Sequence, residues 1–302
     1  MSRLSASVVL TTFNAPEVLR LALRGLARQS TPPAEVLIAD DGSEVDLTPV
    51  LTRLAADMPF SLIHLWQPHQ GFRAARSRNN AIFRAQGNIL AFLDQDTVPH
   101  SDWLEAHVAG LESERVSLGD VIPLSEAEVA GLDESAVRSG LFEGAFSDVN
   151  RHRLSRLQRR YSFYAWLRRA GIPVKAKPRL RSSNFAIPAA CLREVNGFDE
   201  AYVGWGQEDD DLGRRLYRLG VHPLIRVTAA RVAHWPHPPR RPADWNSGAN
   251  SRRFREGDSR LARCEAGLSH HPHPDVRVQV FPGQAAGAET AMASGIKATR
   301  AV

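Results

Sequence analysis

The sequence predicts an α/β fold in which helices cover both faces of a mostly parallel, Rossmann-like central sheet. Within the first 120 residues, short apolar runs alternate with stretches of helical periodicity, and polar clusters follow several of the apolar runs. Such βαβα alternation is typical of parallel sheets with crossover helices on both faces. With 302 residues, of which 43% are hydrophobic, the chain is long enough for one large domain of this kind.

Four short apolar runs are expected to form the strands of this sheet, because each ends in polar or turn-forming residues. They are residues 7–12, 36–39, 60–66 and 89–93. Helices are expected to follow the first three strands, beginning near Pro16 and Pro49 and covering residues 74–85. The apolar residues after Pro16 recur on one helical face: Leu19, Ala22, Leu23, Leu26 and Ala27.

The rest of the chain departs from this alternation. Residues 124–181 have a helical composition and become basic, with no Asp or Glu from Arg151 onward. Regular structure is expected to resume over residues 182–235, including a strand over residues 223–232. The tail from about Ser269 is rich in His, Pro, Gly and Ala, and its end is expected to be disordered.

Composition and charge narrow the class of protein. A formal net charge of +5 and a pI of about 9.7 suit anionic ligands such as nucleotide diphosphates, nucleic acid or an anionic membrane surface. Cys191 and Cys264 have no metal-type spacing and predict no disulfide framework, so a reducing cytoplasm is expected. The sequence shows neither a signal-peptide pattern nor a run of roughly 20 apolar residues that would span a membrane.

Polar clusters follow three of the predicted strands: Thr12-Phe13-Asn14, Asp40-Asp41 and Asp94-Gln95-Asp96. In open α/β sheets, ligands bind at the carboxyl ends of the strands. Two acidic pairs there would repel each other without a cation or a donor partner. Carboxylates suit a hard cation such as Mn²⁺ or Mg²⁺, which stabilises a diphosphate leaving group. By itself, an Asp-x-Asp triplet is common in proteins and favours a solvated turn.

An arginine-rich helix start precedes the strand that ends at Asp94. It runs from Gly71 to Ala81. Arg73 and Arg76 in this run suit phosphate binding through guanidinium forks, next to the N–H groups of a helix N-terminus. A solvated, arginine-rich helix face explains the same residues.

The most distinctive run covers residues 197–212. It contains four consecutive acids, Glu208 to Asp211, at the start of a predicted helix, where the helix dipole favours negative charge. A carboxylate in this turn, beside Trp205, has the features of a general base with a raised pKa. Helix initiation alone accounts for the acids but not for Gly204-Trp205-Gly206, an aromatic ring between small residues that suits stacking on a sugar.

Together these motifs resemble those of family 2 glycosyltransferases with the GT-A fold. The matching N-terminal residues are Thr12-Phe13-Asn14, Asp40 to Ser43, Arg78-Asn79 and Asp94-Gln95-Asp96. The run from Trp205 to Asp211 is similar to the signature of beta-1,4-galactosyltransferases and bacterial chondroitin-polymerase-type enzymes. The similarity covers about residues 7–234. Two features depart from the family pattern. Gln95 stands where a small or apolar residue is more usual, and the basic segment 151–181 is not part of the shared signature, so the identity of the acceptor is not specified.

The resemblance implies a role for each matching residue. In the donor site, Thr12 and Asp41 would face the nucleotide, Arg78 and Asn79 the diphosphate, and Asp94 the ribose or the metal. The Mn²⁺ or Mg²⁺ ligands would be Asp96 and His234, with His237 as a competing imidazole. The acceptor would meet Trp205, Gly206 and Glu208. The catalytic residues would be Asp209, as the base, and its neighbour Glu208.

By this resemblance the chain is expected to be a metal-dependent, inverting glycosyltransferase that moves a hexose or N-acetylhexosamine from a UDP-sugar to a carbohydrate or glycolipid acceptor. The expected divisions are a nucleotide-sugar-binding half (1–121), a basic helical insert (122–181), an acceptor and catalytic half (182–268) and a tail (269–302). No nucleic-acid partner is expected. The arginines of 151–181 are expected to meet an anionic acceptor or the inner membrane face rather than internal acids, although a solvated face fits as well.

Two rival functions fit parts of the sequence. A nucleotidyltransferase of similar fold would share the sheet and the metal but would not need Trp205 or the second acidic cluster. A protein that binds nucleic acid or membranes through its arginines would leave the acidic clusters unexplained, and it would bind in a salt-sensitive manner independent of metal. An inactive relative that only binds carbohydrate is a further alternative, but the presence of all the acidic residues of the motifs argues against it.

Overall fold

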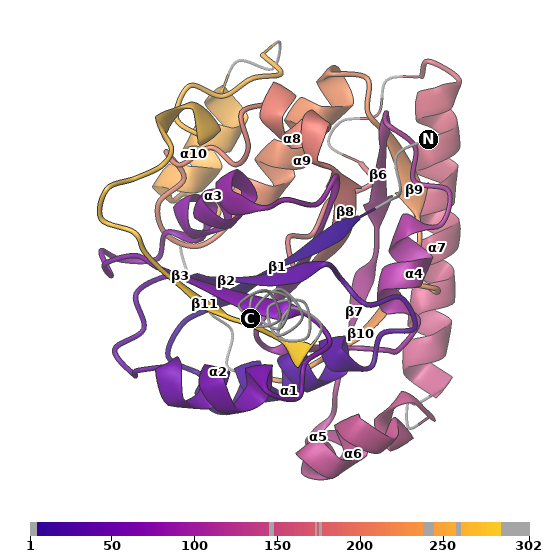
Figure 1. Cartoon of the computed structure of the whole chain (residues 1–302). Coiled ribbons are helices and arrows are strands. Elements are labelled where there is room, and N and C mark those ends of the chain that lie inside the picture. Colours follow the sequence, from indigo (N-terminus) through magenta and orange to yellow (C-terminus); the bar gives the residue numbers. More distant parts are fainter. Residues whose placement is uncertain are drawn as a thin grey trace, which may run out of the picture.

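The computed structural model describes residues 5–144, 148–172, 174, 177–237, 245–257 and 261–284. At its centre is an eight-stranded sheet with the strand order β11-β3-β2-β1-β4-β8-β6-β9, and helices pack on both faces (Figure 1). The expected α/β architecture, a large and mostly parallel sheet flanked by helices, is confirmed.

Four parallel strands of the N-terminal part form the middle of the sheet. β1 (Ala6–Thr12) lies between β2 (Glu35–Asp40) and β4 (Ile89–Asp94), and β3 (Ser61–Trp66) lies beyond β2. The helices that follow the first three strands are α1 (Pro16–Ala27), α2 (Thr48–Ala55) and α3 (Ala74–Arg84). The four strands and α3 begin and end within one residue of the positions expected from the sequence.

The later part of the chain adds strands to the same sheet. β8 (Asn184–Pro188) runs antiparallel between β4 and β6 (Arg115–Leu118), and β9 (His222–Ile225) lies parallel to β6. A second, three-stranded sheet has the order β5 (Thr97–Pro99), β10 (Arg231–His234) and β7 (Asp120–Pro123). Other helices of the described chain are α4 (Trp103–Val108), α5 (Glu126–Ala130), α6 (Glu134–Ser139), α7 (Asp148–Arg169), α8 (Ala189–Glu194), α9 (Glu208–Arg218) and α10 (Ala249–Glu256), with 3-10 turns at Leu141–Gly144 and Leu268–His270.

The prediction of a single strand over residues 223–232 is wrong, because this segment contributes to two strands in different sheets, β9 and β10. The N–H groups of Ala229 and Ala230 both donate to the carbonyl of Arg226, which closes a turn between the two strands. No Gly or Pro marks this turn in the sequence. The turn lets β10 end at His234, paired with Thr97 just beyond β4.

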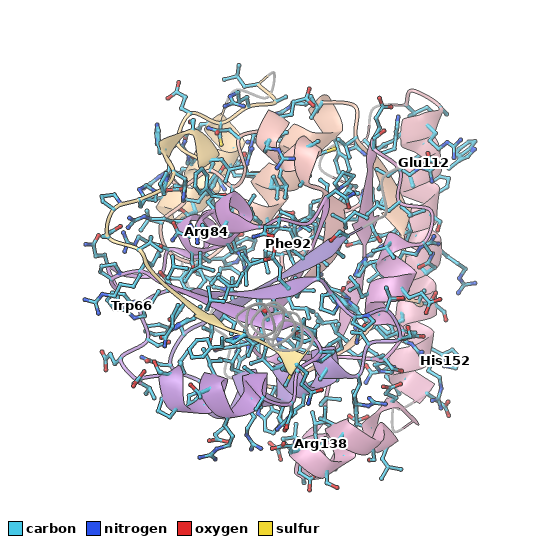
Figure 2. All side chains as sticks on the ribbon, in the orientation of Figure 1. Trp66, Arg84, Phe92, Glu112, Arg138 and His152 are labelled. Carbon is cyan, nitrogen blue, oxygen red and sulfur yellow. The ribbon has the colours of Figure 1, made fainter. Side chains whose placement is uncertain are left out.

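Two apolar layers, one on each face of the sheet, stabilise the fold. Alternate residues of β1 enter different layers: Val8 and Leu10 belong to the layer that contains the apolar residues of α1, α2 and α4, whereas Val9 belongs to the layer of α3, α7, α8 and α9. A period of two is expected for a strand that is buried on both faces. Figure 2 shows side chains filling the space between the sheet and the helices.

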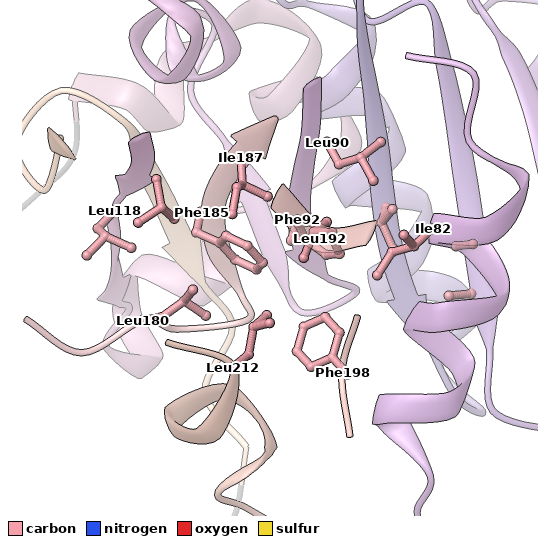
Figure 3. Packing of buried hydrophobic residues seen from close by; sticks show 14 of the residues in the cluster. Ile82, Leu90, Phe92, Leu118, Leu180, Phe185, Ile187, Leu192, Phe198 and Leu212 are labelled. Carbon is pink, nitrogen blue, oxygen red and sulfur yellow. The ribbon is translucent and has the colours of Figure 1, made fainter. Parts of the chain in front are cut away.

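Aromatic rings join the two parts of the chain at the centre of the second layer. Phe92 in β4 stacks on Phe185 in β8, with ring centroids 4.3 Å apart, and Phe198 meets Phe92 edge-on at 6.0 Å (Figure 3). Leu192 of α8 and Leu212 of α9 belong to the same cluster. This packing anchors α9, whose first turn holds the acidic run, beside the central strands.

The basic segment lies in α7, which packs against β9 and β7, and in the residues after it. Arg153 and Arg181 lie 3.8 Å and 3.3 Å from the carboxylate of Asp120, and Arg179 pairs with Asp210. The expectation that these arginines meet no internal acid is therefore wrong for these three, and also for Arg151, which pairs with Asp148 at 2.5 Å. The partners of the first three come from β7 and α9, which the sequence of the segment does not reveal. No described helix has the length and apolar character needed to cross a bilayer.

The C-terminal tail is ordered further than expected. β11 (Arg277–Phe281) pairs antiparallel with β3 and forms one edge of the large sheet. In the sequence, Val278 and Val280 alternate with Arg277 and Gln279, but in the structure both valines are exposed and only Phe281 of this strand is buried. Its place is set by backbone pairing with β3. The remaining part of the expected disordered tail, residues 285–302, lies outside the described residues.

Candidate active site

The carboxyl ends of β1, β2 and β4 meet at one edge of the sheet. Thr12 pairs with Asp40 across β1 and β2, and Thr11 pairs with Asp94 across β1 and β4. The hydroxyl of Thr11 donates to Oδ1 of Asp94 at 2.5 Å. The structure therefore brings together the three polar clusters that follow predicted strands.

The two acids after β2 have different surroundings. Asp40 is buried and accepts hydrogen bonds from the N–H and the hydroxyl of Ser43, both at 2.8 Å, so it shapes the loop. Asp41 accepts from the side-chain amide of Gln67 at 2.6 Å and from the N–H of Arg73 at 2.7 Å. Burial raises the pKa of Asp41, and these two donors offset part of that rise.

Gln95, the middle residue of the Asp94–Asp96 triplet, attaches the triplet to β1. Its Oε1 accepts from the hydroxyl of Thr12 at 2.6 Å and from the N–H of Phe13 at 2.9 Å, and its Nε2 donates to the carbonyl of Phe13 at 3.2 Å. Gln95 is buried, so this bonding fixes the backbone between the two acids. Its role was not apparent in the sequence, because Thr12 lies 83 residues away.

Arg78 on α3 bridges the two acidic clusters. Its Nη2 donates to Oδ1 of Asp94 at 3.0 Å, and its Nη1 donates to Oε1 of Glu208 at 3.1 Å. The guanidinium is buried 5.3 Å from the centre of the Phe198 ring. Burial lowers the pKa of Arg78, but the charges of Asp94 and Glu208 raise it above its ordinary value. A permanent positive charge therefore lies between the strand ends and the start of α9.

Other polar side chains of α3 point away from this edge. Nδ2 of Asn79 donates to the carbonyl of Phe198 and to Oε1 of Glu200, and Oδ1 of Asn79 accepts from the N–H of Phe198. Arg76 pairs with Asp275 at 2.5 Å. Successive residues of a helix differ by about 100° in direction, so Asn79 holds the turn after Gly197 while Arg78 faces the acids.

Four consecutive acids begin α9, and arginines neutralise three of them. The pairs are Glu208 with Arg78, Asp210 with Arg179, and Asp211 with Arg214 and Arg215. Within the ranges that the structure describes, Asp209 has no cationic side chain within ion-pairing distance. Asp209 therefore differs from its neighbours although all four carry the same formal charge.

The surroundings of Asp209 favour its protonated form. Burial, together with the charges of Glu208 and Asp210, raises the pKa of Asp209 to about 7. The N–H of Asp210 donates to Oδ1 of Asp209 at 2.7 Å and opposes part of this rise. A carboxyl group with this pKa exchanges protons near neutral pH, which is the property required of a general base.

Asp96, His234 and His237 form a cluster that could hold a metal ion. Nε2 of His234 lies 3.8 Å from Oδ1 of Asp96, and Nε2 of His237 lies 3.3 Å from Oδ2. One ligand atom from each residue lies within 4.8 Å of the others. Burial lowers the pKa of His234, which keeps the imidazole in the neutral form that a metal requires. Both imidazoles suggested by the sequence thus meet Asp96.

Trp205 lies in the turn that leads into α9, edge-on to Trp245 with ring centroids 6.2 Å apart. Nδ2 of Asn250 donates to the carbonyl of Gly206 at 3.0 Å and holds this turn. Gly206 has a φ of 92°, a conformation that favours glycine. Trp245 was missed in the sequence, because an isolated tryptophan after a proline-rich stretch carries no recognisable motif.

A cavity of about 530 Å³ connects these groups. Its lining includes Trp205, Gly206, Glu208, Asp209, His234 and His237. Arg179 and Arg181, which the sequence placed in the basic insert, line it as well. A smaller cavity of about 80 Å³ reaches Thr12 and Asp41 and shares Phe72, Arg78, Asp94 and Asp96 with the larger one. Another cavity of about 580 Å³ lies beside α9 and α10, away from the strand ends.

Two family models match most of the chain. The one described as glycosyl transferase family 2 matches residues 7–170, and the one described as the N-terminal domain of galactosyltransferase matches residues 172–238. The chain belongs to glycosyl transferase family 2. The second match contains the acidic run of α9, so the galactosyltransferase-like motif expected from the sequence is confirmed.

Several glycosyltransferases are related to this chain in sequence. The hyaluronan synthase of Pasteurella multocida is 27% identical over 260 residues, covering 77% of this chain and 24% of the synthase. The validoxylamine A glucosyltransferase of Streptomyces hygroscopicus subsp. limoneus is 28% identical, covering 88% and 56% of the two chains. The chondroitin synthase of Escherichia coli is 24% identical, covering 77% and 35%. The chain thus spans 24% to 56% of the length of these relatives.

Solved structures with a similar fold include two complexes with UDP ligands. GalNAc-T7 with UDP, GalNAc and Mn²⁺ has a TM-score of 0.56 at 16% identity, covering 84% of this chain and 48% of that one. S. aureus TarS 1–349 with UDP-GlcNAc has a TM-score of 0.53 at 15% identity, covering 78% and 60%. At these identities the likeness shows the fold, and the expected GT-A fold is confirmed.

Proposed function

We propose that this chain is an inverting glycosyltransferase that moves a hexose or N-acetylhexosamine from a UDP-sugar to a carbohydrate or glycolipid acceptor. The observation that carries this proposal is the position of Asp209. It is an acid without an arginine partner among the described residues, and it opens on the same cavity as Arg78 and the Asp96–His234–His237 cluster. Membership of family 2 supports sugar transfer, and relatives named as polysaccharide synthases support a carbohydrate acceptor.

In this proposal the donor occupies the strand-end side of the cavity. Thr12 and Asp41 border the small cavity, where we place the base of the nucleotide, and residues 1–121 supply most of this half. The permanently charged guanidinium of Arg78 binds the diphosphate, and the carboxylate of Asp94 contacts the ribose beside it. Asn79 contributes indirectly, by holding the turn after Gly197.

The acceptor occupies the α9 side, within residues 182–268. The ring of Trp205 stacks on the acceptor sugar, and Glu208, held by Arg78, binds sugar hydroxyls. Asp209 takes the proton of the acceptor hydroxyl as its oxygen bonds to the anomeric carbon, while the bond from that carbon to the diphosphate oxygen breaks. Attack from the face opposite the leaving group inverts the anomeric configuration.

The ligand set of Asp96, His234 and His237 fits a divalent cation, because one carboxylate and two imidazoles converge there. Mg²⁺ strongly prefers oxygen ligands, so the two imidazoles favour Mn²⁺. When bound, such a cation would neutralise the negative charge that develops on the departing diphosphate.

Donor screening with and without metal tests this function. UDP release is measured with a panel of UDP-hexoses and UDP-N-acetylhexosamines and with sugar acceptors. We expect acceptor-dependent release with Mn²⁺, its loss in EDTA or in Asp96→Ala, and normal release in Asp148→Ala, a control at an exposed site on α7. Full turnover in EDTA would contradict the role of the metal. Pyrophosphate release from nucleoside triphosphate plus sugar phosphate would instead identify a nucleotidyltransferase.

We also propose that one face of α7 contacts the anionic membrane surface that carries a glycolipid acceptor. Phe163 and Trp166 are 56% and 59% exposed, and their rings stack with centroids 6.0 Å apart. Arg156, Arg159 and Arg160 are also exposed, and their spacing of three or four residues continues the same face. Exposed aromatic and basic side chains on one helical face suit the interface of an anionic bilayer.

A further inference from the structure

A second cluster of metal-ligating side chains lies outside the residues that line the active-site cavity. Glu200, in the turn after Gly197, meets His271 and His273 of the C-terminal segment. Nε2 of His271 lies 2.6 Å from Oε1 of Glu200, and Nε2 of His273 lies 3.2 Å from Oε2. One ligand atom from each residue lies within 4.8 Å of the others. Two imidazoles therefore approach the two oxygens of one carboxylate.

This cluster is enclosed by the protein. The side chain of His271 is 1% exposed and that of Glu200 is 11% exposed. A carboxylate in such a place is costly unless a cation faces it. The two nearby arginines do not pair with it: Arg76 is paired with Asp275 at 2.5 Å, and Arg73 interacts with Glu200 electrostatically but lies beyond ion-pairing distance. The cluster thus has an enclosed negative charge and two nitrogen ligands beside it.

Outer contacts hold Glu200 in place. Nδ2 of Asn79 donates to Oε1 of Glu200 at 2.8 Å, and the backbone N–H of Glu200 donates to the carbonyl of Ala266 at 2.9 Å. The ring of Phe83 lies 6.0 Å from that of His271 and forms an apolar wall. Metal-ligating carboxylates are typically oriented by such outer hydrogen bonds, so the site is prepared before any ion binds.

We propose that Glu200, His271 and His273 bind a zinc ion that fastens the C-terminal segment to the turn preceding α9. Two imidazoles and one carboxylate are a ligand set for a first-row transition ion. Zinc bonds of about 2.0–2.2 Å in tetrahedral geometry separate the ligand atoms by about 3.3–3.5 Å. One ligand atom from each residue already lies within 4.8 Å of the others, and the 2.6 Å between Nε2 of His271 and Oε1 of Glu200 would widen by less than about 1 Å on binding. A water molecule completes the fourth position.

The site joins two segments that are distant in the sequence. The turn that carries Glu200 continues into Trp205 and the acidic start of α9, while His271 and His273 precede β11. A hydrogen bond joins the same two parts of the chain nearby: Nδ2 of Asn196 donates to the carbonyl of Cys264 at 2.9 Å. An ion bound to the folded junction but not to the unfolded chain stabilises the fold and supports the position of the acidic run.

Cobalt uptake tests this site in the full, untagged chain. In an Asp96→Ala, His234→Ala background, which removes the first cluster, the metal-free protein is titrated with Co²⁺ and then with Zn²⁺. We expect one Co²⁺ per chain with the visible absorption of a low-coordinate site, displacement by Zn²⁺, and a rise in Tm with Zn²⁺. Loss of an outer-shell partner typically costs 10–100-fold in metal affinity, so loss of the ligand in His273→Ala should cost at least about 100-fold and remove the rise in Tm.

Two further variants make the outcome decisive. Glu200→Gln keeps the shape of the side chain and should also lose Co²⁺, so it decides the matter if His273→Ala fails to fold. His222→Ala, at an exposed site on β9, removes a histidine elsewhere and should bind Co²⁺ normally. Absence of Co²⁺ uptake by the background protein overturns the proposal, as does uptake that is unchanged by both His273→Ala and Glu200→Gln. These readouts do not depend on glycosyl transfer.

Discussion

At the scale of single residues, the four acids of α9 differ through their neighbours rather than their chemistry. Glu208, Asp210 and Asp211 are paired with arginines. These ion pairs occupy the three carboxylates, which suits binding and helix support. Asp209 is half-buried and has no such partner among the described residues, and the pKa of Asp209 is raised to about 7. The same turn therefore contains both structural acids and a candidate base.

We expect Asp209→Asn to lower kcat by about 10²–10⁴-fold with little change in donor affinity, because it removes the proton acceptor and keeps the shape. The base acts in its deprotonated form, so wild-type kcat should rise with pH through about 7, and the variant should lose this rise. UDP release between about pH 5.5 and 9 measures both effects. Asp210→Asn is the matched control and should lose much less. Near-normal turnover of Asp209→Asn, or a larger loss in Glu208→Gln with donor binding intact, would assign the base elsewhere.

At the scale of elements, α7 and the residues after it divide the basic segment into two groups. One face of α7 is buried through Leu154 and Tyr161. Beyond the helix, Arg179 pairs with Asp210, which lines the cavity, and Arg181 pairs with Asp120. The opposite face remains exposed and carries the arginines and aromatic rings proposed to meet a membrane. The helix thus connects a surface that suits lipid with the rim of the active site.

We expect the triple change Arg156→Glu, Arg159→Glu and Arg160→Glu to weaken binding to anionic vesicles. Each basic residue near such a surface contributes about 1 kcal/mol, so the affinity should fall by about 100-fold or more. Vesicle sedimentation measures it, and turnover with a water-soluble acceptor should stay normal. Arg53→Glu and Arg84→Glu, exposed on α2 and α3, are the controls. Equal sedimentation of the triple variant and the wild type would show that this face is merely solvated.

At the scale of the whole molecule, the sheet is completed by a strand that comes from the end of the described chain. β11 covers the edge of β3, and Phe281 inserts into the same apolar layer as α1 and α2. The C-terminal segment therefore contributes to the core formed by the N-terminal strands and helices, although it lies at the other end of the described chain. Residues 261–284 belong to the folded domain.

We expect Phe281→Ala to lower the free energy of unfolding by about 3–5 kcal/mol, because it removes a buried ring and leaves a cavity. Val280→Ala, at a side chain that is 56% exposed on the same strand, should cost about 0.5 kcal/mol or less. Urea unfolding followed by circular dichroism compares the two variants. Similar, small losses in both would mean that β11 is not required for the stability of the domain.

The sequence by itself determined the central strands, the α/β class and the family. Strands 7–12, 36–39 and 89–93 were predictable because local apolar periodicity reports burial on the sheet, and the polar clusters mark the strand ends. The acidic run from Glu208 and the triplet around Asp96 identified the family because their residue types and spacing are local.

Tertiary structure decided the contacts between distant residues. Arg78 reaches Glu208 across 130 positions, and Gln95 reaches Thr12 across 83. The ion pairs that leave Asp209 distinct, the position of Trp245 and the pairing of β11 are likewise set by packing. Local sequence cannot specify them, because a hydrogen bond or ion pair depends on which elements the fold places side by side. The sequence thus supplied the chemical groups, and the fold decided which of them meet.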